Sequence, residues 1–272
     1  MWPQVGYFIQ VTVARAYVRV IGAQRELSWL VGDTLLPLLS VVGYVLVYRA
    51  MKAPPEYTGF VILGGVLMTF WAHMLWSMGL QLFWEKEMGN LARYLMAPLP
   101  RPALLLGMAL GGIVMTTSRA LVIYIASRFL FKIHFNVSQP WLALAVFLMT
   151  LASLYGMGMA LSSLFFMVGR GANYGLQAIF EPVVFLGGFY FPINRLGLVV
   201  ASASAALIPT TLGLDALRQT MFNSRQIGFL APEVELSALV VMSVIFVWLS
   251  VFAVRKMEEL GRAHGKLIAK EQ

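Results

Sequence analysis

The chain alternates between long apolar runs and short segments rich in charged, proline and aromatic residues. Six of the runs are long enough to cross a hydrocarbon core, which needs roughly 20 apolar residues. We expect membrane-spanning helices at Trp29–Val47, Thr58–Leu82, Ala103–Ser127, Trp141–Val168, Tyr174–Phe191 and Leu236–Val254. Aromatic residues stand at many ends of these runs, as anchoring at the membrane–water interface predicts. The pattern predicts an all-α integral membrane protein with six transmembrane helices within residues 29–254.

The segment before the first run, residues 1–28, has the periodicity of an amphipathic helix. Its apolar residues recur at spacings of three and four: Tyr7, Val11, Ala14, Val18 and Ile21. Arg15 and Arg19 fall on another face, where they can reach lipid headgroups. We expect an interfacial N-terminal helix and no cleavable signal peptide, because a charged start, a short apolar core and a cleavage site do not follow one another here.

A charged segment, Phe83–Pro102, separates the second and third apolar runs. Three prolines at positions 98, 100 and 102 end any helix that precedes them, because proline lacks an N–H and disfavours helix in the residue before it. We therefore expect a short helix at the membrane face, at about residues 84–97. A surface helix in this position is well placed to receive force from another protein.

Residues 192–235 are too polar for one span and too apolar for an ordinary loop. They include Val199–Ile208, an apolar run of about ten residues that is too short to cross the membrane. Non-helical backbone at that depth must be shielded by protein or line a watery cavity. The pattern predicts a re-entrant outer segment at about residues 192–220.

Composition agrees with a membrane setting and excludes a soluble domain. Hydrophobic residues make up 60% of the 272 positions, charged residues 12%, and the mean hydropathy is +0.78. Soluble domains average about 25% charged residues. The net charge of +8 does not indicate nucleic-acid binding, because the basic residues are scattered among the ends of the spans.

The distribution of Lys and Arg predicts the orientation. With both termini on one side, that side carries twelve of these residues, the other side seven, and Arg119 lies within a span. The positive-inside rule then places both termini and the charged segment in the cytoplasm. We expect a multi-pass protein of the plasma (inner) membrane with a basic cytoplasmic tail at residues 255–272.

The sequence carries no catalytic constellation. The nearest likeness to a phosphate-binding loop, Gly261–Leu267, has the wrong glycine spacing and lacks a Ser or Thr after its lysine. The chain has no cysteine and no serine-hydrolase elbow. We expect no catalytic residue, cofactor site or metal site in this chain, and if ATP energises transport, the ATPase is another chain.

Four ionisable residues fall within the apolar runs: Asp33, His73, Arg119 and Glu181. An ionisable group is costly in hydrocarbon, so each is a candidate functional residue. Structural roles are favoured for the first three. Glu181 precedes Pro182, whose ring removes a backbone hydrogen bond and opens the helix locally. A gating or substrate-path role for Glu181 stands beside the alternative that it pins the fifth span to its neighbours.

Three motifs, taken in order, resemble those of one family. They are Glu85-Lys-Glu-Met-Gly89 followed by Leu95 and Pro98, then Gly187-Gly-Phe-Tyr-Phe-Pro192, then Ile208-Pro209 with Leu214-Asp-Ala-Leu-Arg218. Over nearly its full length the chain resembles the membrane permease subunit of type-2 ATP-binding-cassette (ABC) exporters. The family often has Ser-Gly where this chain has Gly187-Gly188, and Glu181 is not a general family feature.

The resemblance implies a dimer of permease chains, identical or homologous, with two cytoplasmic ATPase subunits that bind Mg-ATP. It implies that the charged segment is the coupling helix, and the expected coupling residues are Glu85, Lys86, Glu87, Met88, Gly89, Leu91 and Leu95. In this interpretation Glu85 and Glu87 meet basic or polar groups of the ATPase, while Met88, Leu91 and Leu95 supply apolar contact.

A substrate path is expected between the two permease chains, lined by the second and fifth spans. The candidate residues are Phe70, Trp71, Met74, Phe180, Glu181, Phe185 and Phe189. Aromatic and Met side chains suit an amphiphilic or lipidic substrate. The same residues could equally face lipid or the interior of the bundle.

Other functions stay open at this point. An ATP-independent secondary transporter is the main alternative, although no inverted repeat relates the two halves of the chain. A translocase of the twin-arginine type shares six spans and an intramembrane Glu near Pro, but not the N-terminal pattern. The sequence does not reveal the substrate, which could be a drug, lipid, polysaccharide or peptide, nor the direction of transport beyond the resemblance.

Overall fold

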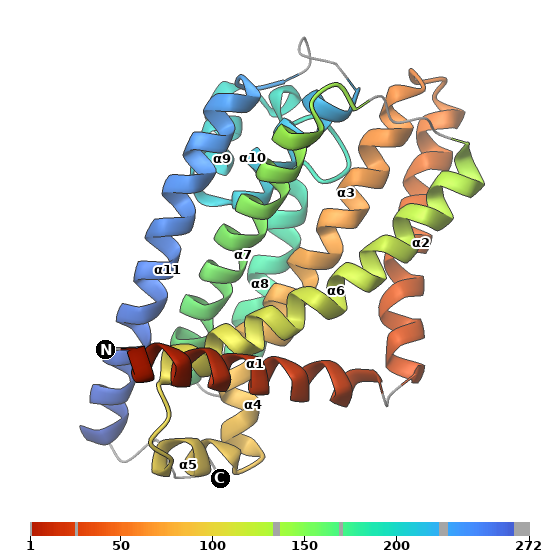
Figure 1. The fold of residues 1–272 in the computed structure, drawn as a ribbon. Coiled ribbons are helices and arrows are strands. Elements are labelled where there is room, and N and C mark those ends of the chain that lie inside the picture. Colours follow the sequence, from red (N-terminus) through yellow and green to blue (C-terminus); the bar gives the residue numbers. More distant parts are fainter. Residues whose placement is uncertain (1, 25–26, 133–136, 169–170, 223–227, 264–272) are drawn as a thin grey trace.

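A computed structural model of the protein describes residues 2–24, 27–132, 137–168, 171–222 and 228–263. Every regular element in these ranges is a helix (Figure 1). The elements are α1 Trp2–Gln24, α2 Leu27–Ala50, α3 Glu56–His73, the π-helix η1 Met74–Gly79, α4 Gln81–Glu87, α5 Asn90–Met96, α6 Arg101–Phe131, α7 Pro140–Val168, α8 Ala172–Leu186, the 3₁₀ turn η3 Ile193–Leu196, α9 Leu198–Leu207, α10 Pro209–Phe222 and α11 Pro232–Ala263.

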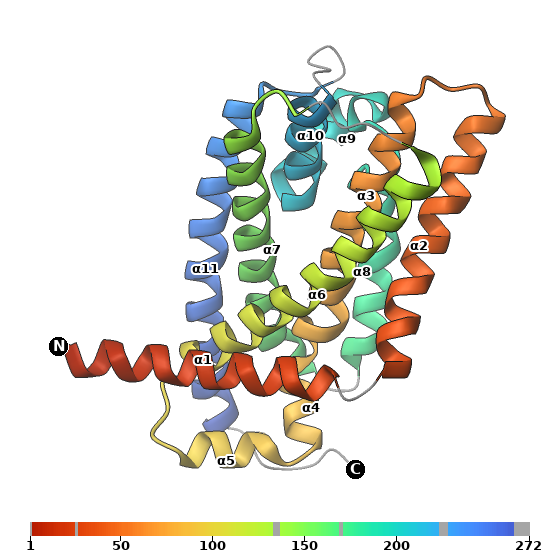
Figure 2. The ribbon, with the colours of Figure 1, turned by 45° about the vertical axis from the view of Figure 1, so that its right-hand side comes forward.

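The predicted N-terminal helix is present as α1, which lies across one end of the bundle (Figures 1 and 2). It packs on α6 at two glycines that are one helical turn apart. A Cβ atom at Gly107 would lie 2.5 Å from the carbonyl oxygen of Thr12, and one at Gly111 would lie 2.9 Å from that of Ala16. Only glycine lets the two helices approach this closely, so this pair seats α1 on the bundle.

In the described ranges, five helical stretches are long and apolar enough to cross a membrane, and they correspond to five of the six predicted spans. They are Val31–Ala50, Glu56–Glu87, Arg101–Phe131, Pro140–Phe166 and Pro232–Met257. The exception is the predicted span Tyr174–Phe191. Its helix, α8, has 15 residues and ends at Leu186, so it is about 22 Å long, shorter than the roughly 30 Å hydrocarbon core.

The early end of α8 has a local cause. Gly188 adopts φ +66°, the left-handed conformation in which helices commonly stop. The backbone of Phe189 then passes so close to α3 that a Cβ atom at Gly64 would lie 1.6 Å from its carbonyl oxygen. Hydropathy alone extends the helix through this turn, because Phe189, Tyr190 and Phe191 are as apolar as a span.

The segment after α8 forms the two helices α9 and α10, which meet at an angle of 109°. They lie at the end of the bundle opposite α1 (Figure 2), and we call this the α10 end. The bend fits the re-entrant segment that the sequence predicts. Twelve of the 14 residues of α10 are buried although six of the 14 are polar, and buried polar side chains usually find partners inside the protein.

Helix α3 forms the centre of the bundle and contacts α2, α6 and α10. It is apolar on every face, and 13 of its 18 residues are buried. The last helix, α11, lies along α7 and continues to Ala263. Residues 255–263, predicted as part of a tail, therefore prolong the last helix, and residues 264–272 lie outside the described ranges.

Candidate functional site

The predicted coupling helix is two short helices, not one. Helix α4 continues the direction of α3 out of the bundle, and α5 turns across its end beside α1 (Figure 1). Gly89 joins them with φ +75°, a conformation that other residues rarely adopt. The prediction of a single helix over residues 84–97 was wrong, because Gly89 ends one helix and changes the direction of the chain before the next.

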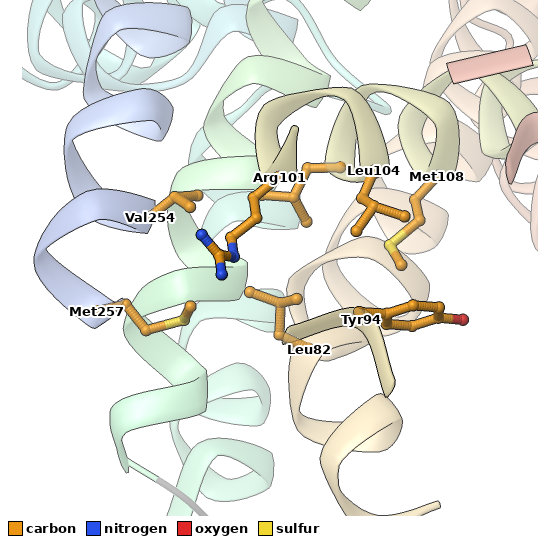
Figure 3. Close-up of a pocket in the computed structure, with 8 residues that line it drawn as sticks. Leu82, Tyr94, Arg101, Leu104, Met108, Val254 and Met257 are labelled. Atoms are coloured by element: carbon orange, nitrogen blue, oxygen red, sulfur yellow. The ribbon is translucent and has the colours of Figure 1, made fainter. Parts of the chain in front are cut away.

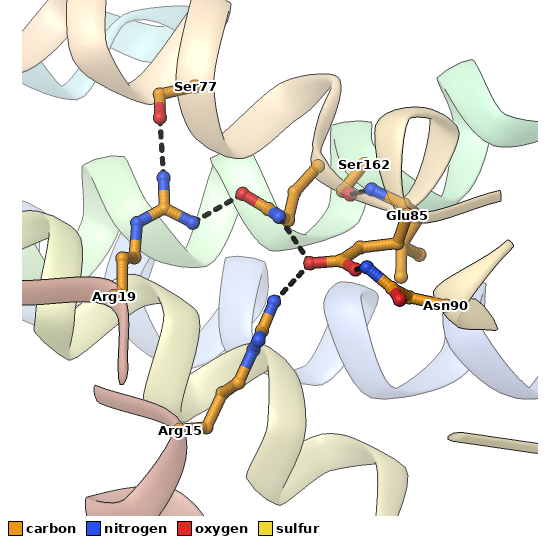
Figure 4. A network of polar contacts seen from close by, with 8 residues as sticks. Arg15, Arg19, Ser77, Glu85, Asn90 and Ser162 are labelled. Atoms are coloured by element: carbon orange, nitrogen blue, oxygen red, sulfur yellow. Dashed lines mark hydrogen bonds and ion pairs between the residues drawn. The ribbon is translucent and has the colours of Figure 1, made fainter. Parts of the chain in front are cut away.

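Glu85 faces the interior of the molecule. Its carboxylate forms an ion pair with Arg15 of α1, and it accepts hydrogen bonds from the side-chain amides of Gln81 at 2.9 Å and Asn90 at 3.1 Å (Figure 4). The side chain of Glu85 is 5% exposed and that of Arg15 16%. Glu85 thus joins α1, α4 and α5, and its carboxylate is not presented to a partner protein.

Arg19 extends the same network one turn further along α1. Its guanidinium donates hydrogen bonds to the side-chain oxygens of Gln81 in α4 and Ser77 in η1 (Figure 4). Burial lowers the pKa of Arg19 to about 10, so the group remains charged at neutral pH. Arg15 also lies over the ring of Tyr94 in α5, 5.3 Å from its centroid. We call the side chains Arg15, Arg19, Ser77, Gln81, Glu85 and Asn90 the polar joint.

The other predicted coupling residues divide between the interior and the surface. Lys86 is buried, with its ammonium 5.4 Å from the ring centroid of Phe166, and Glu87 is partly buried. Met88 is 65% exposed and Gly89 is also exposed. The side chains of Leu91 and Leu95 lie outside the described part of the chain.

Sequence reasoning missed two exposed residues of this element. Its prediction that Arg15 and Arg19 reach lipid headgroups was wrong, because both side chains bond to α4 and η1 inside the protein. Trp84 is 43% exposed and Met96 80% exposed, so with Met88 this element carries three exposed apolar side chains. We call Trp84, Met88 and Met96 the apolar patch. The sequence does show large apolar residues within a charged segment, so Trp84 and Met96 could have been identified. The partners of Arg15 and Arg19 lie some 60 to 70 residues away in the chain, so these contacts could not.

A small cavity lies behind the polar joint, where α4 and α5 meet α6 and α11 (Figure 3). Its walls include Leu82, Tyr94, Arg101, Leu104, Met108, Val254 and Met257. Its volume of about 30 Å³ can hold one or two water molecules but no substrate. This region is therefore a packed joint between helices and not a binding pocket.

Four of the seven predicted path residues lie in the core of the chain. Phe70, Trp71, Met74 and Phe189 are each at most 1% exposed. Phe70, for example, packs edge-on against Phe147 of α7 with ring centroids 5.7 Å apart. In this conformation these four side chains pack in the interior of the bundle, and Phe70 also lines a cavity among α3, α6, α7 and α10.

The remaining three path residues lie on α8. Phe185 is 59% exposed, Glu181 is exposed, and Phe180 is partly buried against Trp76. The exposed residues of α8 recur at helical spacing along one stripe: Tyr174, Gln177, Ala178, Glu181, Pro182 and Phe185. Lipid is a poor neighbour for a carboxyl and an amide group, so this stripe is suited to a watery cavity or a second protein chain.

The other intramembrane ionisable groups have partners within the chain. Arg119 of α6 donates a hydrogen bond of 2.6 Å to the carboxylate of Asp33 in α2. His73 lies 3.0 Å from the hydroxyl of Tyr155, between Nδ1 and Oη. These contacts fit the structural roles expected for the three residues, and the ion pair between Asp33 and Arg119 could not be read from positions 86 apart.

At the α10 end, Arg218 of the third sequence motif contacts the second motif, Gly187 to Pro192. Its buried guanidinium donates to the carbonyl oxygens of Gly188 (2.9 Å), Phe189 (2.8 Å), Phe191 (3.1 Å) and Phe60 (3.2 Å). The motif from Gly187 to Pro192 thus supplies acceptors and the motif that ends at Arg218 supplies the donor. The two motifs form one structural unit that fixes α10 against α3 and the turn after α8.

The helical architecture and the spans define a multi-pass membrane protein. A family model for the ABC-2 type transporter matches residues 10–222. The chain therefore belongs to the ABC-2 type transporter family, as the resemblance in its motifs indicated. Members of this family are membrane components of ABC transporters that associate with ABC ATPase subunits and are generally not catalytic themselves. A comparison with curated proteins found no match to the chain.

Proposed function

We propose that this chain is the permease subunit of an ABC exporter, which forms a substrate path with a second permease chain. Separate cytoplasmic ATPase subunits, two per complex, bind Mg-ATP and drive it. ATP binding biases a two-state membrane element, and the motion reaches the spans through α4, α5 and α1. Membership of the ABC-2 family supports this proposal.

The observation that carries the proposal is that the segment of α4 and α5 carries both the polar joint and the apolar patch. Trp84, Met88 and Met96 offer the kind of exposed apolar surface that marks protein interfaces. In the same segment, the buried pair of Glu85 and Arg15 joins α4 to α1. A movement of the apolar patch would therefore move α3 and α1 together.

The exposed stripe of α8 supports a second permease chain. A carboxyl group that faces hydrocarbon is expensive, and Glu181 is exposed in the isolated chain. A second chain facing this stripe would place Glu181, Phe180 and Phe185 in a shared, partly aqueous path. Such a path would suit an amphiphilic or lipidic substrate.

The proposal places the chain in the inner membrane, with both termini in the cytoplasm. The side that holds twelve of the Lys and Arg residues is the side of α1, α4 and α5, and those three elements gather at one end of the bundle (Figure 2). The apolar patch then faces the compartment that contains ATP.

The test is a comparison of two methionines of similar exposure at opposite ends of the bundle. Met88 is 65% exposed in the apolar patch, and Met51 is 71% exposed beside the α10 end. The tagged full-length chain is purified from its native membrane in mild detergent, and the co-purified ATPase is quantified by mass spectrometry. We expect Met88→Glu to reduce the recovered ATPase at least tenfold and Met51→Glu to leave it unchanged.

Two results would overturn the proposal. One is the absence of any ATPase from the unsubstituted chain when that chain is intact and folded, which would favour an ATP-independent transporter. The other is equal recovery of the ATPase with both variants, which would place the docking surface elsewhere.

A further inference from the structure

Helix α8 is barely covered by the rest of the chain. Only Ala172 and Leu176 of its 15 residues are buried, whereas 13 of the 18 residues of α3 are buried. Its contacts within the chain are mainly with α7, α9 and η1. The exposed stripe of α8, from Tyr174 to Phe185, is therefore open to whatever occupies the proposed path.

The carboxylate on this stripe has no counter-charge in the neighbouring helices. Of the residues that the structure describes, none forms an ion pair with Glu181. The helices α2, α3 and α8 together contain a single Lys or Arg, Arg49, and its guanidinium lies over the ring of Phe131 in α6. An identical second chain would add a second carboxylate and no further cation from α8. A cation that enters the path would supply the missing charge.

Two stacked tyrosines lie beside this carboxylate. The hydroxyl group of Tyr190 interacts electrostatically with Glu181. The ring of Tyr190 stacks on that of Tyr44 in α2, with ring centroids 3.9 Å apart and an angle of 14° between the rings. Tyr44 is 44% exposed, so this aromatic pair reaches the same open surface as Glu181.

Further aromatic side chains lie before and after Glu181 along α8. Toward the α1 end, Phe180 packs against the partly exposed Trp76 of η1, with ring centroids 6.1 Å apart. Toward the α10 end, one helical turn beyond Glu181, Phe185 is 59% exposed and packs edge-on against Phe191. Aromatic faces attract cations, and they do so most strongly where water is excluded.

This combination of groups selects an organic cation over a metal ion. Hard metal cations take six or more oxygen ligands, and the described residues contain no group of three His, Cys, Asp or Glu side chains that could hold a metal ion. The other amide or carboxyl group on the stripe is the amide of Gln177. Aromatic rings suit instead the apolar body of an organic molecule.

We propose that the transported substrate is an organic cation with an apolar body, whose charge lies at Glu181 and whose apolar groups pack on Tyr44, Phe185 and Trp76. This inference rests on the proposed function, in which the stripe of α8 lines the path. It narrows the amphiphilic substrate of that proposal to one sign of charge.

The test measures binding of two ions of nearly the same shape and opposite charge, tetraphenylphosphonium and tetraphenylborate. The full-length chain is purified in mild detergent, and binding beyond that of protein-free micelles is measured by equilibrium dialysis. We expect the chain to bind the phosphonium ion at least tenfold more tightly than the borate ion. Glu181→Gln should weaken phosphonium binding at least tenfold and Glu181→Asp less than threefold. The control Glu259→Gln removes a carboxylate of α11 that is 69% exposed and should change binding less than twofold.

Two further variants keep Glu181 in place. Gln177→Arg puts a guanidinium one helical turn from the carboxylate, where the two side chains can pair, and should weaken phosphonium binding at least tenfold. Its control, Gln177→Met, adds no charge and should change binding less than twofold. Phe185→Leu keeps an apolar side chain but removes an aromatic face, and should weaken phosphonium binding at least threefold. Thermal unfolding in detergent identifies any variant that fails to fold, and the remaining variants carry the test.

Equal binding of the two ions by the unsubstituted chain would overturn the inference, because it would show that Glu181 is neutralised by a proton. Unchanged phosphonium binding in Glu181→Gln would overturn it as well, because the cation would then lie elsewhere. The binding assay needs no ATPase, so the two proposals fail separately. A co-purified ATPase without cation binding would refute the substrate class alone, whereas cation binding at Glu181 without any ATPase would support the site and refute the ATP-driven exporter.

Discussion

Breaking the ion pair between Glu85 and Arg15 should release α1 from the bundle. Pairs exposed to water contribute about 0.2–1 kcal/mol, whereas removal of one partner of a buried pair costs about 3–5 kcal/mol. Exposures of 5% and 16% place this pair near the buried limit, although Arg15 can turn toward water at the end of the bundle. We therefore expect about 2–3 kcal/mol, or roughly a 30- to 150-fold shift toward undocked α1.

The absence of cysteine from the chain makes this shift measurable. Thr12 lies on the face of α1 that packs on α6, where it is 5% exposed and its carbonyl oxygen contacts Gly107. A single reporter, Thr12→Cys, reacts with a thiol reagent only when α1 lifts from α6. In this background Glu85→Gln should raise the labelling rate about 30- to 150-fold, while a reporter at the exposed Val5 should label at one rate throughout.

A double-mutant cycle separates the pair from its surroundings. Arg15→Met alone should raise the labelling of the reporter about as much as Glu85→Gln, and the two together should do little more than either alone, because each removes the same interaction. If the combined effect equals the product of the separate effects, the pair contributes nothing specific. A rise below about threefold for Glu85→Gln would refute the assignment of Glu85 to a joint with α1.

Two further predictions test the packing of α3 and the role of α8. Gly64→Ala should lower the midpoint of thermal unfolding in detergent by several degrees, because its Cβ atom would meet the carbonyl oxygen of Phe189 at 1.6 Å. The control is Gly43→Ala, whose Cβ atom would have no neighbour within 4 Å and which should leave the midpoint unchanged or raise it slightly. Equal midpoints for the two variants would contradict the close approach. Glu181→Gln should leave unfolding unchanged and lower transport several-fold in vesicles; normal transport would remove Glu181 from the path.

The spans were predictable because their signal is local. A run of apolar residues identifies a membrane helix whichever neighbours it meets, and five of the six runs coincide with helices of sufficient length. The failure at residues 187–191 came from a glycine turn inside an apolar run. The division at Gly89 has the same origin, since a single left-handed residue changes the direction of a helix without altering its composition.

The placement of side chains was less predictable than the spans. Helix α3 is apolar all round, so periodicity could not tell that Phe70 and Trp71 face the interior of the bundle. Charged residues misled the prediction in another way, because an acidic residue in a surface segment suggests a partner outside the chain. Glu85 instead finds Arg15, 70 residues earlier in the chain, and a contact between distant residues leaves no trace in one sequence.

The four carbonyl contacts of Arg218 have a consequence for biogenesis. Their acceptors are translated earlier, Phe60 by 158 residues and the turn after α8 by about 30. Until α10 has been synthesised and has entered the bundle, the three carbonyl groups of the turn lack this donor in a medium where an unsatisfied backbone group is costly. The second half of the chain should therefore integrate as one late, cooperative step, and a chain that stops before Arg218 should be recognised and degraded as incomplete.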